Sequence, residues 1–219
     1  MPNHGRTDDR RDRECVSMIR VLIVDDHPTV RAGLHGLLGA EPGIVPVGTS
    51  ESAADALAQV GGRAPDIVLA DYHLPDRNGL LLGWELKQLQ TPPRVVIYSA
   101  FAEPQLSLAA AVSGLDAVLD KNSPVEAIFE TLRAVAAGRT LIGPIPPHVM
   151  RAGASLIDPQ DQAIFGLAVS GEPAEEIAAV LGMDDRIVKR RMKSMVEWLR
   201  PRPRAEVRDQ GTGARGVAS

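Results

Sequence analysis

Five short runs of apolar residues alternate with helical segments along residues 19–140 of this 219-residue chain. The expected strands, which are rich in Val, Ile and Leu, cover residues 20–24, 44–47, 66–70, 94–98 and 115–119. Apolar residues recur at helical spacing, and predict helices, over residues 28–38, 52–60, 79–90, 104–112 and 124–137. Near-continuous apolar strands that alternate with helices are typical of a parallel sheet covered on both faces. We therefore predict an α/β fold with a five-stranded doubly wound parallel sheet, followed by a small all-α helix-turn-helix unit.

The composition excludes several classes of protein. No apolar run approaches the ~18–20 residues that a membrane span needs. The first residues, MPNHGRTDDRRDREC, contain no apolar segment typical of a secretory signal. A single cysteine, Cys15, excludes an internal disulfide framework and a cysteine-rich zinc site. We expect a soluble cytoplasmic protein that makes no contact with membranes.

Polar residues stand where four of the expected strands end. Asp25 and Asp26 follow the first strand, Asp71 the third and Ser99 the fourth, and Lys121 lies just beyond the fifth. Ligands of open α/β sheets bind outside the carboxyl ends of the strands. We therefore expect these five side chains to converge on one site.

Such a group of side chains suits phosphoryl transfer. Three neighbouring carboxylates repel one another unless a cation compensates, and a hard cation with oxygen ligands, Mg²⁺, is the natural partner. Asp71 can act as the nucleophile, while Lys121 and the Ser99 hydroxyl can bind phosphoryl oxygens. A zinc site is disfavoured, because His27 and His73 are the only histidines expected nearby.

The segments VLIVDDHP, DIVLADYHLPDRNG, VVIYSA and AVLDK resemble the signature of response-regulator receiver domains, which have a flavodoxin-like fold. The resemblance covers about residues 19–140. It implies that a sensor histidine kinase or a small phosphodonor phosphorylates Asp71. It also implies that Mg²⁺ is bound by Asp25, Asp26, Asp71 and the backbone carbonyl of His73.

The same resemblance makes Ser99 the switch hydroxyl and Lys121 the invariant lysine of the family. One position departs from the family pattern. Family members usually carry Tyr or Phe three residues before the lysine, and this chain has Val118 there. The usual aromatic switch therefore cannot operate in its ordinary form.

Charge is distributed unevenly in the last third of the chain. Residues 155–185 carry seven acidic and no basic side chains, whereas residues 186–204 carry eight basic and one acidic. Such asymmetry indicates a nucleic-acid contact late in the chain. The alternative is that these charges form a solvated helix face and a charged tail.

The basic stretch coincides with the last helix of a helix-turn-helix pattern. Its apolar positions Val188, Met192, Met195 and Leu199 repeat at helical spacing and predict a core-facing stripe. Basic residues lie on the opposite face or flank it, and fit the major groove of DNA. The candidate DNA-binding residues are Arg186, Lys189, Arg190, Arg191 and Lys193.

Residues 156–199 resemble the LuxR-type output domain of NarL/FixJ response regulators. Pro159, Gly171, the segment EEIAAVLGM and the pair Val188-Lys189 carry this resemblance. It implies that Lys189, Arg190 and Lys193 touch DNA. Two features depart from the family: Ile187 replaces the usual Thr, and the sequence Pro-Arg-Pro at 201–203 opposes a fourth helix. Because that helix often forms the dimer contact, we expect a homodimer through the receiver.

We therefore predict a phosphorylation-controlled DNA-binding transcription regulator that is not an enzyme. The expected domains are a disordered extension (1–18), the receiver (19–138), a linker (139–154), the helix-turn-helix domain (155–200) and a disordered tail (201–219). One alternative is a signalling adaptor whose degenerate output domain binds protein. An aspartyl phosphatase is disfavoured, because such enzymes need a second acid two residues after the first-strand aspartate, and His27 stands there.

Overall fold

A computed structural model describes residues 18–201 of the chain. Its strands are β1 (Ile19–Val24), β2 (Ile44–Ser50), β3 (Ile67–Asp71), β4 (Arg94–Ser99) and β5 (Ala117–Asp120). They form one parallel sheet in the order β2-β1-β3-β4-β5. The predicted five-stranded parallel sheet is thereby confirmed. The expected disorder covers residues 1–18 and 201–219, and all of these except Met18 and Pro201 lie outside the described residues.

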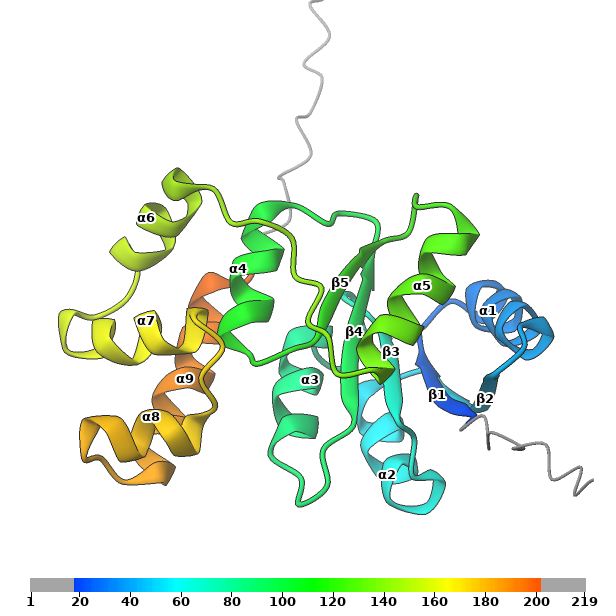
Figure 1. The fold of residues 1–219 in the computed structure, drawn as a ribbon, viewed down its shortest axis with the longest axis horizontal. Coiled ribbons are helices and arrows are strands. Elements are labelled where there is room, and N and C mark those ends of the chain that lie inside the picture. Colours follow the sequence, from blue (N-terminus) through cyan, green and yellow to red (C-terminus); the bar gives the residue numbers. More distant parts are fainter. Residues whose placement is uncertain (1–17, 202–219) are drawn as a thin grey trace, which may run out of the picture.

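Helices cover both faces of the sheet (Figure 1). One face packs against α1 (Pro28–Ala40) and α5 (Val125–Ala136). The other packs against α2 (Ala53–Arg63), α3 (Gly79–Lys87) and α4 (Pro104–Val112). Successive strand residues point to opposite faces, so Leu22 and Val24 enter one core while Val21 and Ile23 enter the other. Strands buried on both faces explain why their sequences read as continuous apolar runs.

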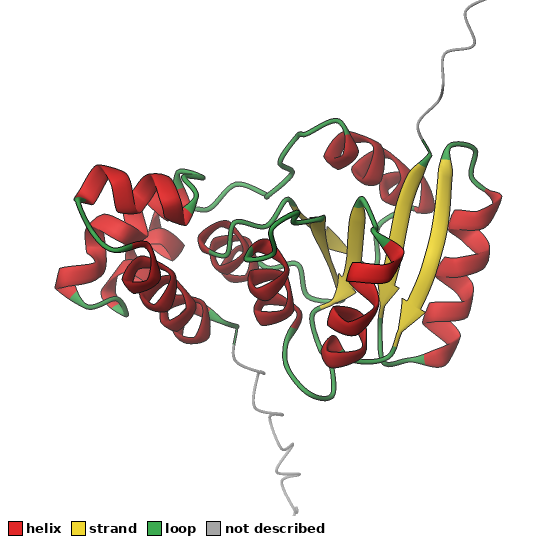
Figure 2. Cartoon of the chain, turned by 90° about the horizontal axis from the view of Figure 1, so that it is seen from below, coloured by secondary structure: helices red, strands yellow, loops and turns green. Residues whose placement is uncertain are grey.

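Four α-helices follow the sheet and lie beside it (Figure 2). They are α6 (Pro147–Ser155), α7 (Gln162–Val169), α8 (Ala174–Leu181) and α9 (Asp185–Leu199), with a short 3-10 turn at Pro159–Asp161. The Asp184 side chain caps α9 by accepting a hydrogen bond from the Arg186 backbone amide at 2.9 Å. Gly182 ends α8 at φ +62°, a left-handed conformation that glycine adopts without strain. Helices α7–α9 thus realise the predicted helical unit.

The segment expected to be a linker, residues 139–154, is more structured than its prolines and glycines indicate. Leu141 forms a parallel bridge with Ala117, and its backbone amide donates to the Asp116 carbonyl at 2.6 Å. Helix α6 then begins at Pro147, within the same segment. Proline at the first helical position has no amide to leave unpaired, so it starts this helix. The boundaries expected for the receiver and the output domain stay a prediction.

Helix α9 packs against the receiver as well as against α7 and α8. Figure 1 shows it beside α3 and α4. Its predicted stripe is buried, with Val188, Met192, Met195 and Leu199 each at most 6% exposed. A Cβ added at Gly153 in α6 would lie 2.4 Å from Leu108 of α4 and 3.2 Å from Leu199 of α9. One hydrophobic core therefore runs from the sheet through α4 into the output helices.

None of the helices in residues 18–201 combines the length and the apolar character that crossing a bilayer requires.

Candidate functional site

Three aspartates gather at the carboxyl edge of the sheet. Asp25 follows β1 and is 1% exposed, and Asp71 ends β3 and is 6% exposed. Together with the more exposed Asp26, and with His27, they offer ligand atoms that all lie within 4.8 Å of one another. The structure therefore brings together the carboxylates that strand-end placement predicts to converge.

Lys121 joins two of these carboxylates. Its Nζ lies 2.7 Å from Asp25 Oδ2 and 3.0 Å from Asp71 Oδ2. Burial lowers the pKa of Lys121, but the hydrogen bonds to Asp25 and Asp71 outweigh this effect and raise it above the usual value. The ammonium also lies 5.5 Å from the centre of the Tyr98 ring. Lys121 is therefore a positive charge at neutral pH, fixed beside the proposed phosphoryl acceptor.

Ser99 ends β4 on the same edge and is 1% exposed. Its hydroxyl oxygen accepts a hydrogen bond from the Phe101 backbone amide at 3.1 Å. The Lys121 amide donates to the Ser99 carbonyl at 2.8 Å, so the ends of β4 and β5 are held together. Val118, where the family favours an aromatic ring, is a half-buried residue of β5.

The two histidines expected near the site differ in position. His27 lies within the acidic group, with its Nδ1 2.6 Å from Asp26 Oδ1. His73 is exposed in the loop between β3 and α3, and its ring packs edge-on against Tyr72. The role expected for the His73 carbonyl stays a prediction.

The donor set indicates which cation this group of residues can hold. Three carboxylates supply oxygen ligands, which hard divalent cations prefer. Lys121 already compensates part of their negative charge by contacting Asp25 and Asp71. Asp26 is more exposed than the other two aspartates, and one of its oxygens contacts His27. The acidic group can therefore hold a divalent cation.

The five basic residues predicted to contact DNA lie along α9, where their surroundings differ. Arg186 and Arg190 are exposed. Lys189 Nζ lies 2.6 Å from Glu175 and 3.0 Å from Asp185, and hydrogen bonding to Glu175 is the main cause of its raised pKa. In return, Lys189 lowers the pKa of Glu175. One predicted contact is therefore partly neutralised by the output domain itself.

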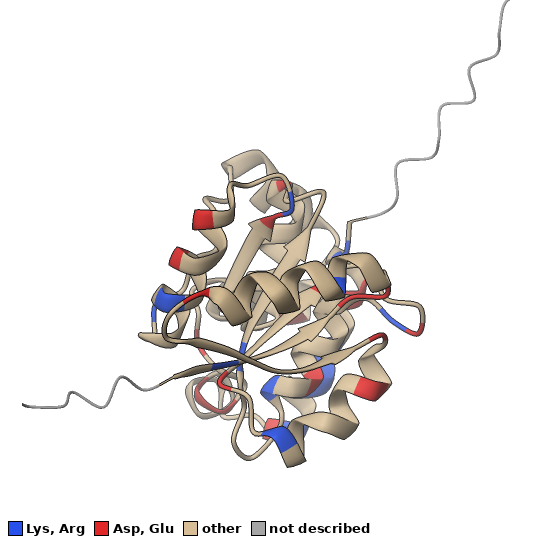
Figure 3. Ribbon diagram, turned by 90° about the vertical axis from the view of Figure 1, so that its right-hand side faces the viewer, with Lys and Arg blue, Asp and Glu red and all other residues tan. Residues whose placement is uncertain are grey.

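The other two basic residues are also engaged. Arg191 pairs with Asp161 inside the output domain. Lys193 Nζ lies 3.6 Å from Glu85 on α3 of the receiver. Elsewhere, the view onto the β2 edge of the sheet shows acidic and basic residues mixed along the receiver helices (Figure 3). The run of basic residues on α9 thus contrasts with the mixed charge of the receiver.

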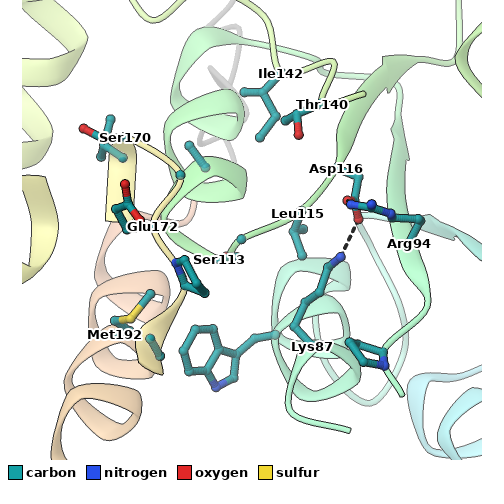
Figure 4. A pocket seen from close by; sticks show the side chains of 18 of the residues that line it. Lys87, Arg94, Ser113, Leu115, Asp116, Thr140, Ile142, Ser170, Glu172 and Met192 are labelled. Atoms are coloured by element: carbon teal, nitrogen blue, oxygen red, sulfur yellow. Dashed lines mark hydrogen bonds and ion pairs between the residues drawn. The ribbon is translucent and has the colours of Figure 1, made fainter. Parts of the chain in front are cut away.

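A cavity of about 880 Å³ lies between the receiver and the turn that joins α7 to α8 (Figure 4). It lies at the amino edge of the sheet, where Arg94 begins β4 and Asp116 precedes β5. Asp116 is 2% exposed and accepts hydrogen bonds from Lys87 Nζ at 2.5 Å and from Arg94 at 2.8 Å. Because this cavity lies at the opposite edge of the sheet from Asp25 and Asp71, it is separate from the site.

The chain is similar to known proteins over both of its parts. Residues 21–133 match the family described as the response regulator receiver domain. The DNA-binding transcriptional activator DevR/DosR of Mycobacterium tuberculosis is 30% identical over 182 residues, which are 78% of this chain and 84% of that protein. The chain belongs to the NarL-type response regulators. The nitrate/nitrite response regulator NarL of Escherichia coli is 26% identical over 85% of this chain and 91% of its own length.

Solved structures agree with this assignment. A LuxR-family two-component response regulator from Aurantimonas sp. superposes with a TM-score of 0.55 at 27% identity. The match covers 62% of this chain and 94% of that one. The predicted resemblance to NarL-type response regulators is therefore confirmed, as is the fold class.

Sequence reasoning missed two residues of this regulator that connect receiver and output domain. The Tyr72 hydroxyl donates to the Pro201 carbonyl at 3.1 Å. Pro201 begins the tail that we expected to be disordered, yet it is half-buried. It lies against Tyr72 and the end of α9. Glu85 faces Lys193. No local signal could have paired residues so far apart in the chain.

Proposed function

We propose that this response regulator is a phosphorylation-controlled DNA-binding transcription regulator. The observation that carries the proposal is Lys121, held between Asp25 and Asp71 at the carboxyl edge of the sheet. A fixed cation beside a nearly buried carboxylate suits phosphoryl transfer, which depends on positioning and charge compensation. The similar protein DevR/DosR is named a DNA-binding transcriptional activator, which supports the same role for α9.

Asp71 is the proposed acceptor. A carboxylate oxygen of Asp71 attacks the phosphorus of a phosphohistidine on a sensor histidine kinase, the P–N bond breaks, and an acyl phosphate forms. Lys121 and the Ser99 hydroxyl bind the oxygens of the transferred group. The chain thus acts as a phosphoacceptor that assists its own phosphorylation and dephosphorylation.

Mg²⁺ is the proposed cofactor. The residues that would hold it are Asp25, Asp26, Asp71 and the backbone carbonyl of His73, all of them oxygen donors. When bound, the ion neutralises negative charge on the phosphoryl oxygens. The nearness of the three carboxylates supports this assignment.

The proposed output is DNA recognition by α9. Arg186 and Arg190 are exposed and suit phosphates or base edges, and Lys189, Arg191 and Lys193 extend the basic set. The proposed domains are the receiver at 19–138 and the helix-turn-helix domain at 155–200, with 139–154 between them. We place the homodimer contact on the receiver and the protein in the cytoplasm.

Labelling with a small phosphodonor tests the acceptor assignment. The full chain is incubated with acetyl phosphate with and without Mg²⁺, and intact mass and peptide mapping report the added phosphoryl group. We expect Mg²⁺-dependent label in the wild type and none in Asp71→Asn. Asp120→Asn, a matched change at the end of β5, should keep the label. Undiminished labelling of Asp71→Asn would refute the assignment.

One observation favours a signalling adaptor as the second candidate. Glu175 and Asp185 both contact Lys189, so the recognition helix carries less available positive charge than its sequence indicates. DNA affinity as a function of salt separates the two candidates. A DNA-binding domain that contacts several phosphates loses affinity steeply with salt, and Arg190→Ala should lower that slope by about one if Arg190 touches a phosphate. An adaptor would have no measurable affinity.

A further inference from the structure

Tyr72 connects the acceptor strand directly to the output domain. It follows Asp71 in sequence and is 6% exposed. Its ring packs edge-on against His73, and its hydroxyl donates to the Pro201 carbonyl at 3.1 Å, just beyond the end of α9. The residue next to the proposed phosphoryl acceptor therefore holds the last described residue of the output domain.

The backbone around Tyr72 is tightly packed. The Gly79 amide donates to the Tyr72 carbonyl at 2.7 Å. A Cβ at Gly79 would lie 2.3 Å from the Asp71 carbonyl oxygen, so only glycine fits at the start of α3. Because the end of β3 packs directly against the start of α3, a shift of Asp71 must also move Tyr72 or α3.

Helix α3 carries a second contact to α9. Glu85 Oε2 lies 2.5 Å from Arg77, and Oε1 of the same carboxylate lies 3.6 Å from Lys193 Nζ. Among the described residues, two polar contacts join the receiver to the output domain, one at Lys193 in α9 and one at Pro201 just beyond it, and both start from the β3–α3 region. The α4 side of the interface is apolar, with Leu108 close to Gly153 and Leu199.

These two kinds of contact respond differently to a small displacement. Hydrogen bonds weaken steeply with distance and angle, whereas apolar packing has no preferred direction. Asp71 is nearly buried, so three added phosphoryl oxygens need room at the carboxyl edge, which the loop beginning with Tyr72 borders. A change at Asp71 should therefore affect the Tyr72 hydrogen bond more than any other part of the interface.

We propose that Tyr72 couples the chemical state of Asp71 to the position of α9. In the unmodified chain the Tyr72 hydroxyl and Glu85 hold the C-terminal half of α9 on the receiver, and a phosphoryl group on Asp71 breaks the Tyr72 contact. Tyr72 is a positioning residue and takes no part in phosphoryl transfer. The inference rests on the proposed role of Asp71 as acceptor.

Hydrogen exchange of the full chain tests the coupling. Beryllofluoride with Mg²⁺ serves as the probe that imitates the phosphoryl group, and mass spectrometry follows peptides of residues 192–200. In the wild type we expect the probe to lower protection of these residues. In Tyr72→Phe, protection should already be roughly two- to tenfold lower without the probe, the range for one lost hydrogen bond, and the probe should add little. Tyr98→Phe, the matched loss of a hydroxyl from the chain's other tyrosine, should leave α9 protection as in the wild type.

A second variant acts away from the acceptor. Coupling between two sites is reciprocal, so weakening the hold on α9 must strengthen binding of beryllofluoride. Glu85→Gln and Tyr72→Phe should both bind the probe more tightly, by up to the factor seen in exchange, while Glu130→Gln on α5 should not. Damage to the site by Tyr72→Phe would instead weaken binding.

The proposal is overturned if Tyr72→Phe leaves α9 protection unchanged, or if it lowers affinity for beryllofluoride. It is also overturned if wild-type chain binds the probe while α9 keeps its full protection, and in that case the acceptor assignment stands. Failure of the acceptor assignment shows separately, as label that persists in Asp71→Asn.

Discussion

Lys121 is the residue whose charge most strongly shapes the site. Its ammonium group contacts the carboxylates of both Asp25 and Asp71, and these hydrogen bonds raise the pKa of Lys121. A cation with a raised pKa contributes stability that is fully present below its unfolded-state value, near 10.5, and is lost as the pH rises through the folded value. Its charge is therefore constant across the neutral pH range.

Replacing Lys121 by methionine removes this charge while keeping a long side chain. The Asp25 and Asp71 carboxylates then lose their shared partner, and the phosphoryl oxygens lose a donor. We expect labelling by acetyl phosphate to slow by about ten- to hundredfold, the range for one hydrogen bond to a charged group. Thermal unfolding of the variant checks that it is folded, and an unchanged labelling rate would show that Lys121 has no part in the transfer.

Glu175 is the acidic residue nearest to Lys189, one of the predicted DNA contacts on α9. It contacts Lys189 at 2.6 Å and adds a negative charge at the start of α8. Glu175→Gln should therefore strengthen DNA binding, by about two- to fivefold for an exposed ion pair. Glu176→Gln removes the neighbouring charge and is the matched control, with a smaller effect. Fluorescence anisotropy on labelled DNA measures both, and weaker binding of Glu175→Gln would contradict the account.

At the scale of elements, the junction of α4, α6 and α9 holds the two domains together. Gly153 of α6 lets Leu108 and Leu199 approach, because any larger side chain would meet both. Leu199 is 6% exposed although it stands at the end of the last described helix. The receiver helix α4 thus covers an apolar face that the output domain presents at its C-terminal end.

Truncating Leu199 tests the strength of this junction. Leu199→Ala removes buried atoms and leaves a void, so the free energy of unfolding should fall by about 2–5 kcal/mol. Leu156→Ala, at a position that is 54% exposed in the same domain, should change it by less than about 1 kcal/mol. Urea unfolding followed by circular dichroism measures both variants. Equal effects of the two changes would mean that the junction is not packed as described.

Much of this structure could be predicted because its signals are local. Asp25, Asp71, Ser99 and Lys121 each stand at the end of an apolar run, and parallel topology alone brings such positions together. Contacts across the two domains carry no local signal. The Pro147 that starts α6 reads in sequence as part of a linker, and the pairing of Leu141 with Ala117 depends on where the folded chain passes.

At the scale of the whole molecule, receiver and output domain share one hydrophobic core. The core continues from Leu22 and Val68 in the sheet through Leu108 in α4 to Met195 and Leu199 in α9. Domains that meet across an apolar interface of this kind are not independent, so the output helices should not move without exposing apolar surface. A change at Asp71 must offset that loss if it is to release α9.

The shared core predicts that residues 18–201 unfold as one unit. Scanning calorimetry of the unmodified full chain should show a single transition whose calorimetric and van't Hoff enthalpies agree. Leu199→Ala should shift that transition as a whole to lower temperature. Two well-separated transitions, with only the second domain affected by the substitution, would show that the domains are energetically independent.

If phosphorylation of Asp71 controls DNA binding by α9, the DNA affinity of the full chain must depend on the chemical state of Asp71. Fragments selected by the protein from a random pool are titrated with and without beryllofluoride and Mg²⁺. We expect the probe to tighten binding by about five- to hundredfold in the wild type, the usual range of coupling between two sites, and to leave Asp71→Asn unchanged. An affinity that is the same with and without the probe in the wild type, or that changes equally in Asp71→Asn, would contradict the claim.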